Sequence, residues 1–212
     1  MTALAALRAA LEHAPPSTGA FAGDPLHASV CVVVAGPSSA PSFCFIRRAR
    51  WTGDPWSEHI ALPGGRRNGD ETPEATVVRE LQEEVGLAVP EAALSRLPRL
   101  AIRLAGRERL MLLDSFVYLA GATVPPLHAG PEIDLAFWVP VATLWDLGNA
   151  TCNVLDDRGE TLVFPAIRVP HGVIFGITLR VVTLLSDQLG LPLPALEEIP
   201  LLRRAPEPER SP

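Results

Sequence analysis

The chain has 212 residues, of which 48% are hydrophobic and 20% charged, as in a soluble globular protein with room for a sizeable core. A net charge of −6 and an isoelectric point of about 5.4 argue against non-specific nucleic-acid binding. The longest apolar run, Val30–Ala35, is far too short to cross a bilayer. We therefore expect neither a nucleic-acid nor a membrane partner.

Strands and a few helices alternate along the chain, which predicts an α/β or α+β layered domain. We expect a helical N-terminal extension at 1–20, one domain at 21–200 and a disordered, proline-rich tail at 201–212. Within the domain, the predicted elements are strands at 28–35 and 42–48, a tight turn at 63–65, a helix at 73–85, a hairpin of 99–104 and 110–119, strands at 133–139 and 161–169, and a helix at 176–189. Thr72, Pro73 and Gly86 supply the start and stop signals of the first helix.

The cysteine pattern favours a reducing compartment. Cys31, Cys44 and Cys152 are odd in number and widely spaced, and no CxxC pair occurs. This argues against disulfides and zinc, and we expect a cytoplasmic location. Cys31 and Cys44 fall in predicted strands and are most simply core residues.

Acidic residues gather on one face of the helix at 73–85. At about 100° per residue, Glu80, Glu83 and Glu84 share an arc of about 100°. Like charges this close repel one another, and a helix accepts that cost most readily when a cation lies among them. The alternative is an acidic face that is merely solvated and balanced by Arg79. Aliphatic side chains occupy the neighbouring arc: Val77, Val78, Leu81 and Val85.

Clustered carboxylates are hard oxygen ligands, which suit Mg²⁺ or Mn²⁺. Gly64 and Gly65 allow the backbone to come close to a metal or phosphate, and the Gly65 carbonyl is a further candidate ligand. Arg79 lies among the acids and can hold a carboxylate through two hydrogen bonds. His59 and His171 have no partner at ligand spacing, so we expect structural or solvated roles for them.

The complete pattern is far more specific than any of its parts. Gly65 is followed after five residues by Glu71, and after seven more by the run Arg79-Glu80-Leu81-Gln82-Glu83-Glu84-Val85-Gly86-Leu87. This matches every defined position of the Nudix box, with a chance probability on the order of 10⁻⁷. The chain therefore resembles the Nudix hydrolases.

That resemblance implies an α/β/α sandwich with a mixed sheet, and a pyrophosphohydrolase that cleaves a nucleoside diphosphate linked to another moiety. It implies a small-molecule nucleotide substrate and leaves a homodimer open. The residues that it assigns to binding Mg²⁺ or Mn²⁺ are Glu80, Glu83 and Glu84, with Glu71 and Arg79 in support and Gly65 at the metal-facing turn.

Two residues are candidates for the catalytic base. One is Glu83, on the helix. The other is Glu132, because Nudix enzymes often bring a glutamate from just before a strand containing tryptophan, here Trp138. A solvated loop acid is the alternative for Glu132.

Residues outside the box resemble the coenzyme A pyrophosphatase branch of the family. They are Phe45–Arg50, Ile60–Arg66, Phe164–Ala166 and Ile174–Thr178, although the loop Gly53–His59 departs from that branch. The resemblance implies cleavage of coenzyme A or its thioesters to 3′,5′-ADP and 4′-phosphopantetheine. Other nucleotides, or a non-catalytic nucleotide sensor, are the alternatives.

A basic cluster could receive the substrate's phosphates. Its members are Arg47, Arg48, Arg50, Arg66 and Arg67, of which Arg48, Arg50 and Arg66 are our candidate substrate-binding residues. One or two of these arginines could instead simply pair with the acidic helix. Trp51 and Trp56 could stack on a base or plug a loop.

Overall fold

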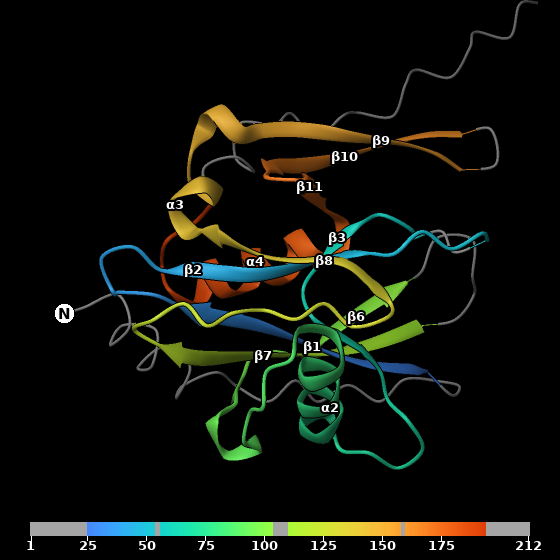
Figure 1. Ribbon diagram of the computed structural model, residues 1–212. Coiled ribbons are helices and arrows are strands. Elements are labelled where there is room, and N and C mark those ends of the chain that lie inside the picture. Colours follow the sequence, from blue (N-terminus) through green and yellow to red (C-terminus); the bar gives the residue numbers. More distant parts are fainter. Residues whose placement is uncertain (1–24, 54–55, 104–109, 158–159, 194–212) are drawn as a thin grey trace, which may run out of the picture.

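The computed structural model describes residues 25–53, 56–103, 110–157 and 160–193 (Figure 1). The helix expected at 1–20 and the tail expected at 201–212 lie outside these residues, as does the tip of the predicted hairpin at 105–108. Within them, no helix is long and apolar enough to span a bilayer.

An eight-stranded mixed sheet forms the centre of the molecule. Its main path runs β3-β2-β1-β7-β5, and β4, β6 and β8 pair with β1, β7 and β2. The central pair, β1 and β7, is parallel, while the other pairings are antiparallel. The strands are β1 Leu26–Ala35, β2 Ser42–Arg48, β3 Ile60–Ala61, β4 Gly64–Arg66, β5 Ser95–Arg96, β6 Leu100–Arg103, β7 Leu110–Gly121 and β8 Ile133–Pro140.

A second, three-stranded sheet and the helices complete the fold. The second sheet has the order β11-β10-β9, with β9 Ala150–Asp157, β10 Glu160–Val169 and β11 Gly172–Phe175. The helices are α2 Pro73–Val85, α3 Val141–Leu144 and α4 Gly176–Gln188, and Glu91–Ala93 and Leu147–Asn149 form single 3₁₀ turns.

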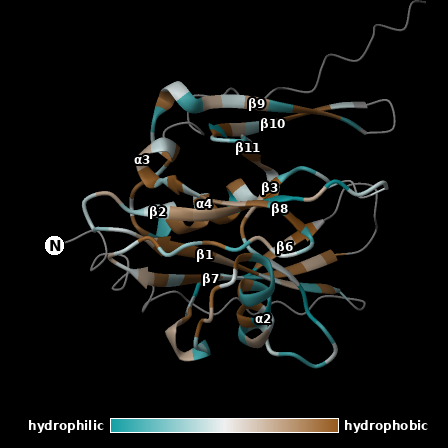
Figure 2. Cartoon of the chain, viewed as in Figure 1, coloured by the Kyte–Doolittle hydropathy of each residue, from teal (hydrophilic) through white to brown (hydrophobic). Residues whose placement is uncertain are grey.

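Both faces of the central sheet are covered, which explains the unbroken apolar run in β1. Cys31 and Val33 pack in one core with α2, whereas Val32 and Val34 pack in the other with α4. In Figure 1 the two helices lie on opposite sides of the sheet. Hydrophobic residues follow the central strands, while the loop that leads into α2 is hydrophilic (Figure 2). The α/β/α arrangement expected from the sequence is confirmed.

The predicted ends of α2 are confirmed in detail. The Thr72 hydroxyl accepts a hydrogen bond from the Ala75 N–H at 3.0 Å, and Pro73 is the first helical residue. Gly86 ends the helix in the left-handed conformation, with φ of +72°. Val77, Leu81 and Val85 are fully buried against the sheet.

The turn predicted at 63–65 is wrong in part, because Gly64 and Gly65 lie in β4 and pair with β1. Gly64 has φ of +144°, and a Cβ there would lie 2.3 Å from the Ser29 carbonyl oxygen. Gly64 therefore serves a close approach between two strands, where only glycine fits.

Candidate active site

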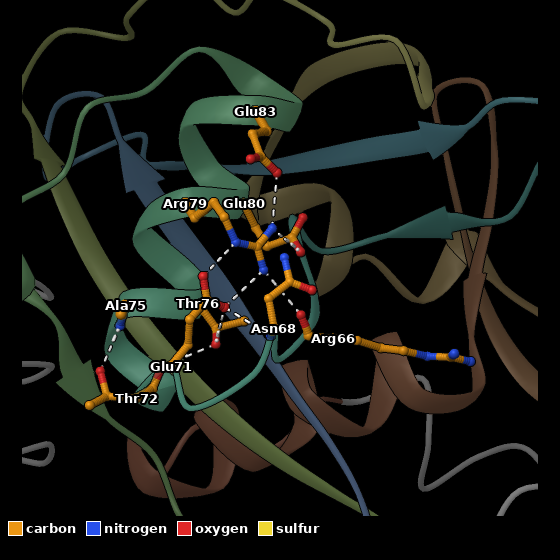
Figure 3. A network of polar contacts seen from close by, with 9 residues as sticks. All are labelled: Arg66, Asn68, Glu71, Thr72, Ala75, Thr76, Arg79, Glu80 and Glu83. Atoms are coloured by element: carbon orange, nitrogen blue, oxygen red, sulfur yellow. Dashed lines mark hydrogen bonds and ion pairs between the residues drawn. The ribbon is translucent and has the colours of Figure 1, made fainter.

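Arg79 lies at the centre of a network of carboxylates on α2 and in the loop before it (Figure 3). Its Nε and Nη2 hold the two oxygens of Glu71 at 2.8 and 3.1 Å. Its Nη1 donates to Glu80 and to Glu83, both at 2.9 Å, and its Nη2 also reaches the Arg66 carbonyl at 3.1 Å. One guanidinium thus links three of the predicted acidic residues to the end of β4.

Glu71 is fixed as an ionised group. Besides Arg79, the Asn68 N–H donates to it at 3.0 Å and the Thr76 hydroxyl at 3.2 Å. These hydrogen bonds, that of Arg79 foremost, lower the pKa of Glu71 to about 2. Glu71 in turn raises the pKa of Arg79.

Glu80 and Glu84 lie one helical turn apart and pack against β4. A Cβ on Gly65 would lie 2.3 Å from Oε1 of Glu80, so this carboxylate occupies the space that a side chain at 65 would need. Oε2 of Glu84 accepts the Gly64 N–H at 2.7 Å. The glycine pair thus brings the backbone up to both glutamates.

The three box glutamates differ sharply in their exposure. Glu84 is 6% exposed, and the side chains of Glu80 and Glu83 are 14% and 57% exposed. Burial raises the pKa of Glu80, and raises that of Glu84 to about 8. A buried and a largely buried carboxylate this close to each other are a site that a cation would stabilise.

Glu132 and Arg48 reach the same region from other parts of the chain. Among the lesser causes of the Glu84 pKa, the charge of Arg48 lowers it and that of Glu132 raises it; Glu132 also raises the pKa of Glu80. Arg48 ends β2, and the Glu132 carbonyl accepts the N–H of the next residue, Ala49, at 3.0 Å. The fold therefore brings Glu132 to the box although almost fifty residues separate them.

The other arginines of the predicted basic cluster do not gather at this site. Arg47 pairs with Asp134, and Arg50 is largely exposed with its Nε 3.9 Å from Glu58. The Arg66 side chain points away from the carboxylates (Figure 3), although its carbonyl belongs to the network. Arg67 is also exposed.

Trp51 and Trp56 have different environments. Trp56 packs against the core on the α4 side, as a loop plug would, whereas Trp51 is 59% exposed. The Ser57 hydroxyl braces the loop by accepting the Trp51 N–H at 2.9 Å and donating to the Trp51 carbonyl at 2.8 Å.

The predicted core cysteines are confirmed, since Cys31 and Cys44 are buried. Burial raises the pKa of both thiols, and the nearby charge of Glu84 raises that of Cys44 further. His59 packs edge-on against Phe175, and His171 against Phe137, as structural side chains would.

The donor set fits a hard divalent cation, because all its members are oxygens and two of them, Glu80 and Glu84, are carboxylates largely withdrawn from solvent. Within the described residues, no three His, Cys, Asp or Glu side chains already converge as metal ligands. Arg79 holds one oxygen of Glu80 and one of Glu83 at its Nη1.

Sequence reasoning missed several groups that hold this site together. Asn68 and Thr76 anchor Glu71. Gly130 and His128 hold the loop of Glu132 against α2. Gly64, which anchors Glu84, belongs to the glycine pair that the sequence singled out, whereas the contacts of Gly130 and His128 depend on how distant segments meet.

A family model described as "NUDIX domain" matches residues 25–157, so the chain belongs to the NUDIX family. An uncharacterized protein of Schizosaccharomyces pombe is 34% identical over 113 residues, which are 50% of this chain and 34% of that protein. A "Putative 8-oxo-dGTP diphosphatase 3" of Mycobacterium tuberculosis is 44% identical over 54 residues, 24% of this chain and 23% of that protein. The chain thus spans about a third or less of these curated relatives.

Among solved structures, a MutT/nudix family protein from Enterococcus faecalis aligns with a TM-score of 0.51 and 20% identity. The alignment covers 70% of this chain and 54% of that one. This likeness confirms the fold, and the family assignment supports the expected class of enzyme, a pyrophosphate hydrolase.

Proposed function

We propose that this chain is a divalent-metal-dependent hydrolase that cleaves the diphosphate of a nucleoside diphosphate linked to another moiety. The observation that carries this proposal is the packing of Glu80 and Glu84, one helical turn apart, against the backbone of Gly64 and Gly65. Together with Glu83 and the Gly65 carbonyl, they would hold Mg²⁺ or Mn²⁺. When bound, such a cation neutralises the diphosphate and acidifies water.

The remaining residues of the network would position these groups. Arg79 orients Glu80 and Glu83 and is itself held by Glu71. A water that attacks phosphorus must lose a proton, and the carboxylate of Glu83 or that of Glu132 would accept it. Glu83 is exposed on α2, whereas Glu132 comes from the loop before β8.

We further propose coenzyme A or one of its thioesters as the substrate. Water would add to one phosphorus of the diphosphate, and the P–O–P linkage would break to give 3′,5′-ADP and 4′-phosphopantetheine, which keeps its acyl group when the substrate is a thioester. Support comes from the resemblance of Phe45–Arg50 and Ile60–Arg66 to the coenzyme A pyrophosphatase branch. It comes also from Arg48, whose charge lowers the pKa of Glu84. Arg50 and Arg66, both exposed, would bind the 3′-phosphate of coenzyme A. The exposed ring of Trp51 would stack on the base.

A second candidate keeps the chemistry but changes the substrate to another nucleotide, such as a nucleoside triphosphate, a dinucleotide or a nucleotide sugar. The mycobacterial relative, which matches this chain over 54 residues, is named a putative 8-oxo-dGTP diphosphatase, and this name favours the alternative. So does the departure of the loop Gly53–His59 from the coenzyme A branch. A non-catalytic nucleotide sensor is a third candidate, which the intact set of box glutamates disfavours.

The substrate is tested by a hydrolysis panel with Mg²⁺ or Mn²⁺, read by chromatography. The panel holds coenzyme A, acetyl-coenzyme A, ADP-ribose, NADH, diadenosine tetraphosphate, 8-oxo-dGTP and the common nucleoside triphosphates. We expect 3′,5′-ADP from the coenzyme A compounds at the highest kcat/KM. A higher kcat/KM for any other member overturns the coenzyme A proposal and selects the second candidate. Tight nucleotide binding without turnover selects the sensor.

A further inference from the structure

The loop between β7 and β8 is fastened to the C-terminal end of α2. The last carbonyl groups of a helix have no partner within the helix. In α2, the Glu84 carbonyl accepts the Gly130 N–H and the Val85 carbonyl accepts the His128 N–H, both at 3.1 Å. Two backbone hydrogen bonds of the loop therefore complete the helix end, and loop and helix are held together at that point.

Gly130 contacts the helix more closely than any other residue type could. A Cβ at this position would lie 1.9 Å from the Glu83 carbonyl oxygen and 3.0 Å from the Glu83 carbonyl carbon. Both are backbone atoms, so the clash cannot be relieved by turning a side chain. A substitution must push the loop away from α2, lengthen the hydrogen bond to Glu84, or do both.

His128 strengthens the same contact through its side chain. A Cβ on Gly86 would lie 3.1 Å from Cβ and 3.3 Å from Cδ2 of His128, so the imidazole covers the glycine that ends α2. Gly130 thus contacts Glu83 and donates a backbone hydrogen bond to Glu84. His128 contacts Gly86 and donates a backbone hydrogen bond to Val85.

Glu132 lies directly beyond this attachment. A tight turn follows Gly130, in which the Ile133 N–H donates to the Gly130 carbonyl at 3.0 Å. On its other side, the Glu132 carbonyl accepts the Ala49 N–H at 3.0 Å. The backbone of Glu132 is therefore held between the end of α2 and the end of β2, two residues from the glycine contact.

We propose that Gly130 is a positioning residue, which fixes Glu132 relative to the glutamates of α2 by its contact with the Glu83 carbonyl. The inference rests on the proposed hydrolase function and deepens it, because it gives Glu132 a part in turnover and names the group that sets its place. The helix and the loop then form one unit, and a shift of about 1 Å between them costs up to about a hundredfold in rate.

The test is a double-mutant cycle of Gly130→Ala with Glu132→Gln, measured on the best substrate of the panel. Alone, Gly130→Ala is expected to lower kcat 10- to 100-fold, with less than threefold change in KM. In the Glu132→Gln background, the same substitution is expected to change kcat less than twofold, because the group that it displaces is already neutral. Gly148→Ala, at a 3₁₀ turn where the nearest atom is a side-chain oxygen of Asp146, is the matched control and is expected to retain wild-type kcat.

Two results would overturn the inference. One is an equal loss of kcat with and without the Glu132 carboxylate, as a general distortion of the fold would give. The other is an unchanged kcat for Gly130→Ala alone. If Gly130→Ala does not fold, His128→Ala replaces it in the cycle, since it keeps the backbone donor and removes only the imidazole. A smaller loss of kcat that again requires the Glu132 carboxylate supports the inference. A loss of kcat that is the same in the Glu132→Gln background overturns it.

Hydrogen exchange separates this inference from the proposed function. In Gly130→Ala, peptides that cover 126–133 are expected to exchange faster than in wild type, while those of β1 and β7 stay protected. Unchanged protection of the loop would contradict the attachment itself. A wild-type protein that hydrolyses no member of the panel with either metal would instead overturn the proposed function, and with it the part assigned to Glu132.

Discussion

Arg79 allows three carboxylates to share a small space in this protein. Its Nη1 lies 2.9 Å from oxygens of both Glu80 and Glu83, while its Nε and Nη2 are held by Glu71. The contact with the exposed Glu83 is screened by water and contributes a few tenths of a kcal/mol. The two-point contact with Glu71 has the better geometry and fixes the guanidinium.

The pKa of Glu71 makes part of the stability depend on pH. Folding lowers this pKa from an ordinary value of 4.5 to about 2, so the folded protein binds fewer protons between these values. The stabilisation is present above pH 4.5 and is lost as the pH falls toward 2. We expect Glu71→Gln to lower the urea midpoint at pH 7, and the difference from wild type to shrink as the pH approaches 2. Glu91→Gln, on an exposed 3₁₀ turn, is the control; a difference that stays constant down to pH 2 would contradict this role of Glu71.

Glu84 is expected to show a conflict between stability and function. A neutral side chain is easier to bury than a carboxylate, and a glutamine oxygen can still accept the Gly64 N–H. We expect Glu84→Gln to stabilise the metal-free protein by roughly 1 kcal/mol and to abolish most of the rise in melting temperature that Mn²⁺ causes in wild type. Thermal melts with EDTA and with Mn²⁺ measure both effects. If Mn²⁺ raised the melting temperature of the variant as much as that of wild type, Glu84 would not be a metal ligand.

At the scale of secondary-structure elements, a buried carboxylate ties two strands and a helix together. Asp114 of β7 is 1% exposed and accepts hydrogen bonds from Arg96 at 2.8 Å and Arg99 at 2.9 Å. Arg96, on β5, also reaches Glu74 in the first turn of α2 at 2.7 Å and lies over the Phe116 ring. The start of α2 is thus anchored to the sheet by charge as well as by packing.

We expect Asp114→Asn to lower the free energy of unfolding by about 2 kcal/mol, because the two arginines lose a charged acceptor. Urea denaturation at pH 7 measures the change. Asp146→Asn is the control, since asparagine also serves where Asp146 accepts the Gly148 N–H. An unchanged urea midpoint for Asp114→Asn would contradict this prediction, because water would then replace the ionic contacts with no loss of free energy of unfolding.

Elements that depend on local signals could be predicted, and those that depend on distant pairing could not. The strand Ser42–Arg48 and the ends of α2 at Thr72 and Gly86 agree with the sequence, because propensity and capping act within a few residues. Strand β9 was missed because Cys152 and Val154 on its open side are exposed, so no buried pattern marks it. Its position depends on β10, to which it pairs along its whole length.

For the whole molecule, the central sheet separates two cores and places the box on one of them. The α2 side carries Glu80, Glu83 and Glu84 above the core of Val77, Leu81 and Val85, while α4 and the second sheet close the other side. The box glutamates could be predicted because one continuous pattern contains them. The contact of Gly130 with Glu83 could not, since it joins segments that only the finished fold brings together.

The most direct test of the central claim is the rate of diphosphate hydrolysis with and without a divalent cation, in wild type and in Glu83→Gln. Because Glu83 is the most exposed of the box glutamates, the variant is expected to fold normally, which circular dichroism and the melting temperature verify. We expect a wild-type rate that depends on Mg²⁺ or Mn²⁺ and falls by several orders of magnitude in Glu83→Gln, whereas Glu91→Gln retains it. A wild-type rate that survives EDTA, or a Glu83→Gln variant with full activity, would contradict a metal-dependent centre on α2.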